Sequence, residues 1–128
     1  MPGSLPSGQA LIQVDKITIA TAELDAMRVF YQVLIGADFR PMDMGGIEFF
    51  IAHAGVEIWL IPRSAAGVIA RDNVVQLRLV VKSVYELLPR LEAAGGVILG
   101  EPQSFQGICL GAIRDPDGNV IELKSSIG

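Results

Sequence analysis

The chain has 128 residues, 51% of them hydrophobic, which is enough for one domain with its own apolar core. Its net charge of -4, without any run of lysine or arginine, leaves nothing to neutralise a phosphate backbone, so nucleic-acid binding is not predicted. No apolar stretch reaches the roughly 20 residues that a membrane crossing needs. A single cysteine, Cys109, excludes an internal disulfide and fits a reducing compartment. We therefore expect a cytoplasmic protein that meets small molecules or other proteins.

The first predicted elements follow a leader, residues 1–11, whose proline, glycine and serine content predicts a flexible segment. Residues 14–20 alternate apolar and polar side chains, which predicts a strand with one buried face. Thr21 is placed to cap a helix, and apolar residues then recur at helical spacing up to Gly36, which should end it. Three short β-prone stretches follow, at residues 38–40, 47–52 and 56–61. The order of this half is βαβββ.

The second half repeats this order. A strand is predicted at residues 74–81, and Ser83 with Glu86 forms a capping-box pattern that opens a helix. Gly95 and Gly96 should stop the helix, although Pro89 lies inside it and should bend it. Strands are then expected near Val97, Cys109 and Val120, the last of them ending at Lys124.

Two shifts of the sequence against itself relate the halves and point to a duplication. The shift that sets Lys16 against Gln76 also superimposes the two predicted helices and their terminating glycines. A slightly larger shift, taken from the turn before the last strand of each half, sets Trp59 against Glu122. We predict one domain over residues 12–124, with module one at about 12–62 and module two at about 73–124.

The chain resembles the vicinal oxygen chelate superfamily, which includes glyoxalase I, bleomycin resistance proteins and extradiol dioxygenases. The resemblance spans about residues 12–124 and rests on Phe30-Tyr31 with Gly36, on residues 91–96, and above all on residues 115–123. It implies an α+β fold in which two βαβββ modules form a curled mixed sheet around a cleft, with the helices outside. Because members of this superfamily commonly form homodimers, the resemblance implies a homodimer here, with a cleft that lies within one chain or is shared between two.

Strand alternation predicts which side chains face that cleft. Ile17, Ile19, Leu77, Leu79 and Val81 should lie under the helices, while the polar face carries the candidate ligand-binding residues Lys16, Glu57, Trp59, Gln76 and Arg78, together with Thr18 and Glu122. Trp59 offers a flat surface for a ligand ring, or else belongs to the core or to a dimer interface. The apolar residues Met42, Met44, Phe49, Phe50 and Phe105 are either a wall of the cleft or simply core.

In catalytic members the resemblance implies four metal ligands, and the matching positions here are Lys16, Trp59, Gln76 and Glu122. Lys16 offers a positive charge and Trp59 only an N–H donor, whereas a divalent ion needs lone pairs. Only Gln76 and Glu122 are suitable ligands, so no metal or other cofactor is predicted. Lys16 is expected instead to pair with Glu122 and keep that carboxylate ionised.

Three functions follow from these features. The first is a metal-free protein of the bleomycin-resistance kind that binds a small organic ligand, neutral or anionic and in part aromatic. The second is an enzyme: either a metal-dependent lyase, isomerase or dioxygenase that uses Gln76 and Glu122, or a metal-free one with Glu122 as general base and Lys16 stabilising an enolate. The third is a structural dimer partner in a larger complex.

Overall fold

The computed structural model describes residues 14–66 and 76–127; the predicted leader lies outside these residues. Module one contains β1 (Lys16–Thr21), α1 (Leu24–Ile35), β2 (Arg40–Met44), β3 (Ile47–His53), β4 (Glu57–Pro62) and a short helix, α2 (Arg63–Ala66). Module two contains β5 (Leu77–Val80), α3 (Val84–Ala93), β6 (Val97–Ile98), β7 (Gln103–Phe105), β8 (Ile108–Arg114) and β9 (Val120–Ser126).

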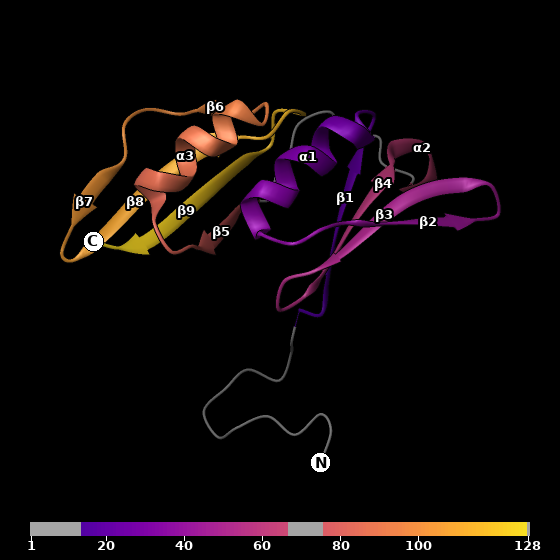
Figure 1. Ribbon diagram of the computed structural model, residues 1–128, viewed down its shortest axis with the longest axis horizontal. Coiled ribbons are helices and arrows are strands. Elements are labelled where there is room, and N and C mark those ends of the chain that lie inside the picture. Colours follow the sequence, from indigo (N-terminus) through magenta and orange to yellow (C-terminus); the bar gives the residue numbers. More distant parts are fainter. Residues whose placement is uncertain (1–13, 67–75, 128) are drawn as a thin grey trace, which may run out of the picture.

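Each module builds its own mixed sheet. The strand order is β1-β4-β3-β2 in the first sheet and β5-β9-β8-β6 in the second, where β7 also pairs with β8. In both sheets the first strand runs parallel to the last, and the other pairs are antiparallel. The helices α1 and α3 lie side by side on the same side of the two sheets (Figure 1). The predicted α+β fold of two βαβββ modules is confirmed, except that the edge of module two is divided into β6 and β7, which both pair with β8. None of the helices within residues 14–66 and 76–127 is long and apolar enough to cross a membrane.

The strand registers agree with the two shifts found in the sequence. In module one, Thr18 on β1 lies opposite Trp59 on β4. In module two, Arg78 on β5 lies opposite Glu122 on β9. The shift that relates Lys16 to Gln76 also relates Thr18 to Arg78, so the sequence repeat is also a repeat of strand pairing.

Several predicted boundaries are wrong for local reasons. Thr21 does not cap α1: it is the last residue of β1, and its hydroxyl accepts a hydrogen bond from the N–H of Glu23 at 2.8 Å, which turns the chain just before the helix. The strand predicted at residues 38–40 lies instead at Arg40–Met44. The last strand continues past Lys124 because the Ser125 hydroxyl is buried and accepts a hydrogen bond from the N–H of Val84, which ties the chain to the start of α3.

Other local predictions are confirmed. Gly36 ends α1 with a left-handed backbone, φ 68°, and its N–H bonds the carbonyl of Gln32. Ser83 caps α3, and its hydroxyl accepts a hydrogen bond from the N–H of Glu86 at 3.2 Å. Pro89 lies within α3 as predicted.

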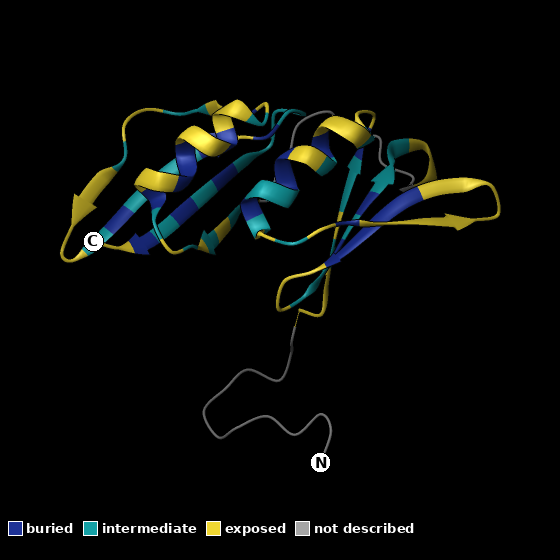
Figure 2. Cartoon of the chain, viewed as in Figure 1, coloured by how far each residue is buried: buried dark blue, intermediate teal, exposed yellow. Residues whose placement is uncertain are grey.

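One apolar core serves both modules, as the buried faces of α1, α3 and the sheets in Figure 2 show. It includes Met27, Phe30 and Leu60 from module one and Leu91, Ile113 and Leu123 from module two, all fully buried. The two halves are in close contact where the Phe30 ring lies against Gly96. A Cβ atom at Gly96 would be only 2.6 Å from that ring and 2.8 Å from the Ile113 side chain, so glycine is required for this contact.

A buried carboxylate also joins the modules. Asp115, in the turn between β8 and β9, is 2% exposed, and its Oδ2 accepts a hydrogen bond from the Tyr31 hydroxyl of α1 at 2.6 Å. The Asn119 side chain donates to the same oxygen at 2.8 Å, while the N–H groups of Asp117 and Asn119 donate to Oδ1, each at 2.9 Å. Both oxygens are therefore satisfied, as a carboxylate withdrawn from water requires. Nearby, Arg63 forms an ion pair with Asp117 at 3.5 Å, a second polar link between the halves.

The Tyr31 hydroxyl gives a testable pH dependence. Burial raises the pKa of Tyr31 above its ordinary value, and the negative charge of Asp115 and the hydrogen bond to it raise it further. Tyr31 thus stays protonated in the folded state, whereas in the unfolded chain its hydroxyl ionises at about pH 10. Its contribution to the free energy of unfolding is therefore complete below pH 10 and is lost as the pH rises further. We expect Tyr31→Phe to lower the free energy of unfolding by about 2 kcal/mol at pH 7. The deficit should shrink by about 1.4 kcal/mol per pH unit above pH 10.

Urea unfolding at pH 7, 10 and 11 measures this difference. Tyr85→Phe is the matched control, because Tyr85 is 57% exposed and its hydroxyl makes one long hydrogen bond, 3.4 Å, to the carbonyl of Pro102. The control should change little at any pH. A Tyr31→Phe deficit that stays constant between pH 7 and 11 would contradict the assignment.

Candidate functional site

The candidate site lies on the sheet faces that the helices leave open, called here the helix-free faces. In β4, Ile58 and Leu60 are buried beneath the helix, so Glu57 and Trp59 point the other way. In β9, Ile121 and Leu123 are buried, and Glu122 alternates with them. The predicted sorting of strand residues is thus confirmed at these positions: Ile19, Leu79 and Val81 pack against the core as expected.

On the first sheet, Lys16, Glu57 and Trp59 come together as a cluster. The Lys16 ammonium lies 4.0 Å from the centroid of the Trp59 ring, a cation–π contact. The indole N–H of Trp59 donates a hydrogen bond to the Glu57 carboxylate at 2.9 Å. Phe49, buried on the neighbouring strand β3, stacks on the indole with ring centroids 5.1 Å apart and planes at 21°. These four residues are called the tryptophan cluster below.

The cluster changes what Trp59 can offer a ligand. Lys16 lies on β1 and Phe49 on β3, the strands on either side of β4, so that an ammonium group and a phenyl ring approach the indole from opposite flanks. A ligand ring would have to displace Lys16 before it could lie flat on Trp59. The accessible chemistry is therefore the ammonium group together with the partly exposed indole.

On the second sheet, Arg78 and Glu122 form an ion pair. The guanidinium Nη2 and the carboxylate Oε2 are 3.4 Å apart, and the two side chains are 49% and 42% exposed. Such an exposed pair contributes little to stability and can open for a ligand. Gln76 is also exposed, directly before β5. The predicted pairing of Lys16 with Glu122 is wrong. The parallel register places Arg78 directly opposite Glu122, and Lys16 belongs to the other sheet, where it lies over Trp59.

The predicted site residues thus form two groups, Lys16, Glu57 and Trp59 on the first sheet and Arg78 and Glu122 on the second. Within residues 14–66 and 76–127, the hydrogen bonds and ion pairs of each group stay inside its own sheet. The helix-free faces also expose apolar side chains: Met44 on β2 is 61% exposed, and Phe105 on β7 is 60% exposed. Met42 and Met44 are accordingly not core residues, whereas Phe49 is buried in its stack with Trp59.

Basic side chains outnumber acidic ones on these faces, although the whole chain has a net charge of -4. Strand register and alternation assign to them Lys16, Arg40, Arg78, Arg114 and Lys124, against Glu57 and Glu122. Glu57 is engaged by the Trp59 N–H and Glu122 by Arg78. The faces therefore present a surface that suits an anion better than a cation.

The four positions that match metal ligands do not fit a divalent ion. The Lys16 ammonium and the Trp59 N–H are donors without lone pairs to give, and the N–H is already used on Glu57. Glu122 has a guanidinium beside it, which would repel a cation. Among the described residues, no three His, Cys, Asp or Glu side chains are grouped closely enough to hold a metal ion.

Comparison with known proteins identifies the family. A family model described as a glyoxalase-like domain matches residues 16–124, so the chain belongs to the glyoxalase-like domain family, and the predicted vicinal oxygen chelate superfamily is confirmed. A comparison with curated proteins found no match.

Solved structures with the same fold include a glyoxalase-related enzyme from Fulvimarina pelagi, at 23% identity and a TM-score of 0.69, with 89% of this chain and 88% of that one covered. A glyoxalase/bleomycin resistance protein/dioxygenase family enzyme from Burkholderia phytofirmans PsJN is 21% identical, with a TM-score of 0.70 and coverage of 88% and 98%. A glyoxalase family protein from Bacillus cereus is 19% identical, with a TM-score of 0.69 and coverage of 97% and 100%. At these identities the likeness establishes the fold alone.

Proposed function

We propose that this glyoxalase-like protein binds a small organic anion, in part aromatic, on its helix-free faces and without a metal. The observation that supports this most directly is the tryptophan cluster, in which a lysine occupies the position of a metal ligand and lies over an indole ring. A ligand carboxylate can attract the Lys16 ammonium away from the ring, since a full negative charge attracts it more strongly than a ring quadrupole does. The ligand's own ring would then lie against Trp59.

The Arg78–Glu122 pair supplies a second recognition element. Its guanidinium can bind a carboxylate or carbonyl group, and its carboxylate can accept a hydrogen bond from a ligand hydroxyl. Glu122 remains our candidate general base for a metal-free reaction on such a ligand. The alternative of a metal-dependent lyase, isomerase or dioxygenase using Gln76 and Glu122 has less support, because Arg78 adjoins Glu122.

We infer further that two copies pair through these faces. Met42, Met44 and Ile47 are all exposed and adjoin one another on the same face of β2 and β3. A contiguous exposed apolar patch of this kind is typical of a protein contact. Pairing of the first sheet of one chain with the second sheet of another would bring the tryptophan cluster opposite Arg78 and Glu122. The binding cleft would then be shared between two chains.

Ligand binding can be measured through the fluorescence of Trp59, the only tryptophan. Benzoate and phenylacetate should change its emission saturably, while benzylamine, of opposite charge, should not. Lys16→Gln should weaken binding of the aromatic carboxylates about tenfold, the effect of one charge-assisted hydrogen bond. Lys82→Gln, on the other side of the sheet, is the control and should bind as the parent does.

A second measurement tests the proposal that the ligand binds without a metal. After incubation with nickel, manganese, iron or zinc, elemental analysis should find far less than one metal per chain. About one tightly held metal per chain would overturn this part and favour the metal-dependent alternative. The proposed anion site would be contradicted if benzylamine bound as tightly as benzoate. It would also be contradicted if Lys16→Gln left the affinity for benzoate unchanged.

A further inference from the structure

A groove between the two modules lies on the helix side of the sheets, separate from the tryptophan cluster. Its volume is about 890 Å³. Its walls come from the last turn of α1, from β5 and from α3, and the apolar side chains among them include Val33, Leu34, Ile35, Leu79, Val81 and Leu87. Neither Lys16 nor Trp59 nor Glu122 lines it. The volume falls within the range of about 300–1,000 Å³ that is typical of small-molecule sites.

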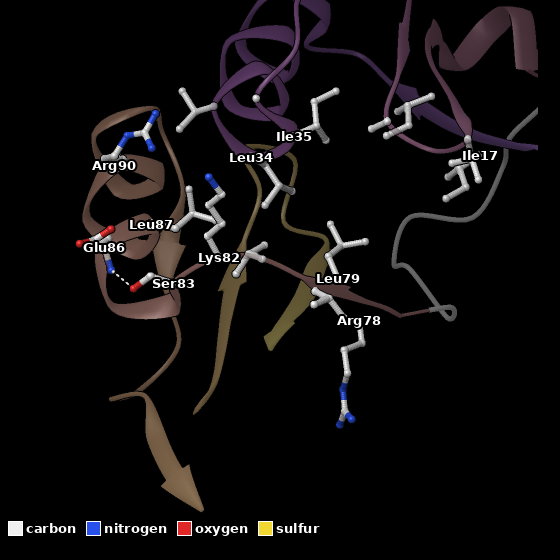
Figure 3. Close-up of a pocket in the computed structure, with 17 residues that line it drawn as sticks. Ile17, Leu34, Ile35, Arg78, Leu79, Lys82, Ser83, Glu86, Leu87 and Arg90 are labelled. Atoms are coloured by element: carbon white, nitrogen blue, oxygen red, sulfur yellow. Dashed lines mark hydrogen bonds between the residues drawn. The ribbon is translucent and has the colours of Figure 1, made fainter. Parts of the chain in front are cut away.

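Four charged residues line this groove, and three are basic: Arg78, Lys82 and Arg90, against Glu86. Figure 3 shows Arg78 directed away from the apolar walls, where it pairs with Glu122. The Glu86 side chain also points away from them, whereas Lys82 and Arg90 extend toward α1.

Lys82 and Arg90 have no acidic partner in the described part of the chain. The ion pairs there involve Arg28, Arg63 and Arg78. Lys82 follows β5 closely and Arg90 lies on α3, so both are held by ordered elements next to the same apolar wall. Both cations border the groove, and neither forms an ion pair in the described part of the chain, so an anion in the groove could make charge-assisted contacts with them.

We propose that this groove binds an organic anion with a linear apolar body, such as a fatty-acid carboxylate. Lys82 and Arg90 bind the carboxylate, and the alkyl chain lies along the last turn of α1 and the helix-facing side of β5. Charge complementarity identifies the occupant: an apolar groove with a basic end suits an amphiphile of one negative charge. The site differs from the aromatic-anion site on the helix-free faces: Arg78 is the one residue common to both, and its side chain points away from the apolar walls of the groove.

Calorimetric titration with decanoate, well below its micelle concentration, tests the proposal. We expect about one decanoate per chain. 1-Decanol should bind at least tenfold more weakly because it lacks the charge, and acetate should not bind because it lacks the chain. The double variant Lys82→Gln/Arg90→Gln should weaken decanoate binding about tenfold or more, the effect of losing two partly exposed charge-assisted hydrogen bonds.

Two controls separate this site from the one on the helix-free faces. Lys16→Gln should bind decanoate unchanged, and decanoate should leave Trp59 emission unchanged. Arg90→Lys keeps the charge and should stay within about threefold of the parent, which also covers the case in which the double variant fails to fold.

Several outcomes would overturn the proposal. These are the absence of decanoate binding at millimolar concentration, equal binding of decanol, and loss of binding in Lys16→Gln. A self-association that the double variant weakens, without any decanoate binding, would instead assign the groove to a second copy of the chain. Failure of the benzoate titration would leave this result untouched, so the two sites are judged separately.

Discussion

Asp115→Ala is expected to lower the free energy of unfolding by about 3 kcal/mol, because it removes the acceptor of a buried network and leaves several donors without a partner. The Tyr31 hydroxyl and the Asn119 side chain would lose their bonds to Oδ2, and the N–H groups of Asp117 and Asn119 theirs to Oδ1. Urea denaturation at pH 7 measures the loss. The expected change is large because this one side chain both closes the turn before β9 and holds α1 of the other module.

Asp43→Ala is the matched control for this variant. Asp43 also accepts a backbone N–H in a turn, that of Gly46 at 3.0 Å, but the turn is exposed to water. Asp43→Ala should lower the free energy of unfolding by less than about 1 kcal/mol, since water replaces the missing acceptor. Combining Asp115→Ala with Tyr31→Phe should cost less than the sum of the single changes, because both remove the same hydrogen bond. Equal effects of Asp115→Ala and Asp43→Ala would show that the network is not a link between modules.

Gly96→Ala is expected to lower the free energy of unfolding by about 3 kcal/mol through overpacking alone. The new Cβ would be 2.6 Å from the Phe30 ring, 2.8 Å from the Ile113 side chain and 3.1 Å from the carbonyl oxygen of Arg114, which belongs to the sheet and cannot turn aside. Gly96 does not have a positive φ, so backbone strain does not contribute. Thermal and urea unfolding of the variant would give the loss.

A second substitution tests the origin of this loss. Phe30→Leu shortens the side chain that the added methyl group would meet, so combining it with Gly96→Ala should cost less than the sum of the two single changes. Gly111→Ala offers a comparison without a backbone contact, because its Cβ would meet side-chain atoms only, the nearest being Val84 Cγ1 at 2.7 Å and Leu88 Cδ1 at 3.3 Å. Strict additivity of Phe30→Leu and Gly96→Ala would show that the Phe30 contact is not the cause.

The regular features of the fold could be predicted because they depend on local sequence. Helical spacing located α1 and α3, and Gly36 and Ser83 marked their ends correctly. Strand β2 was displaced in the prediction because its sequence contains a proline and an aspartate and no β-branched or aromatic residue, so little marks it as a strand. The extension of β9 could not be foreseen either, since it depends on the bond between Ser125 and Val84, which are far apart in the sequence.

The candidate site was predictable in part for the same reason. Strand alternation fixes the face on which a side chain lies, so Glu57, Trp59 and Glu122 were assigned correctly to the helix-free faces. Strand register and the separation of the two sheets decide which charged side chains form pairs. Lys16 therefore lies over Trp59 rather than beside Glu122, and Lys82 and Arg90 border one groove although they come from a strand end and a helix.

The repeated strand register indicates how the two modules evolved. A duplication of one ancestral half would have started with identical residues at each pair of equivalent positions. At several equivalent helix positions the side chains have stayed apolar, as in Met27 and Leu87, because the common core accepts such exchanges. On the open face Trp59 and Glu122 now share neither charge nor shape. Divergence has not been confined to that face, since the fully buried Phe30 is equivalent to the exposed Arg90. It has made a symmetric scaffold into one with two chemically distinct halves.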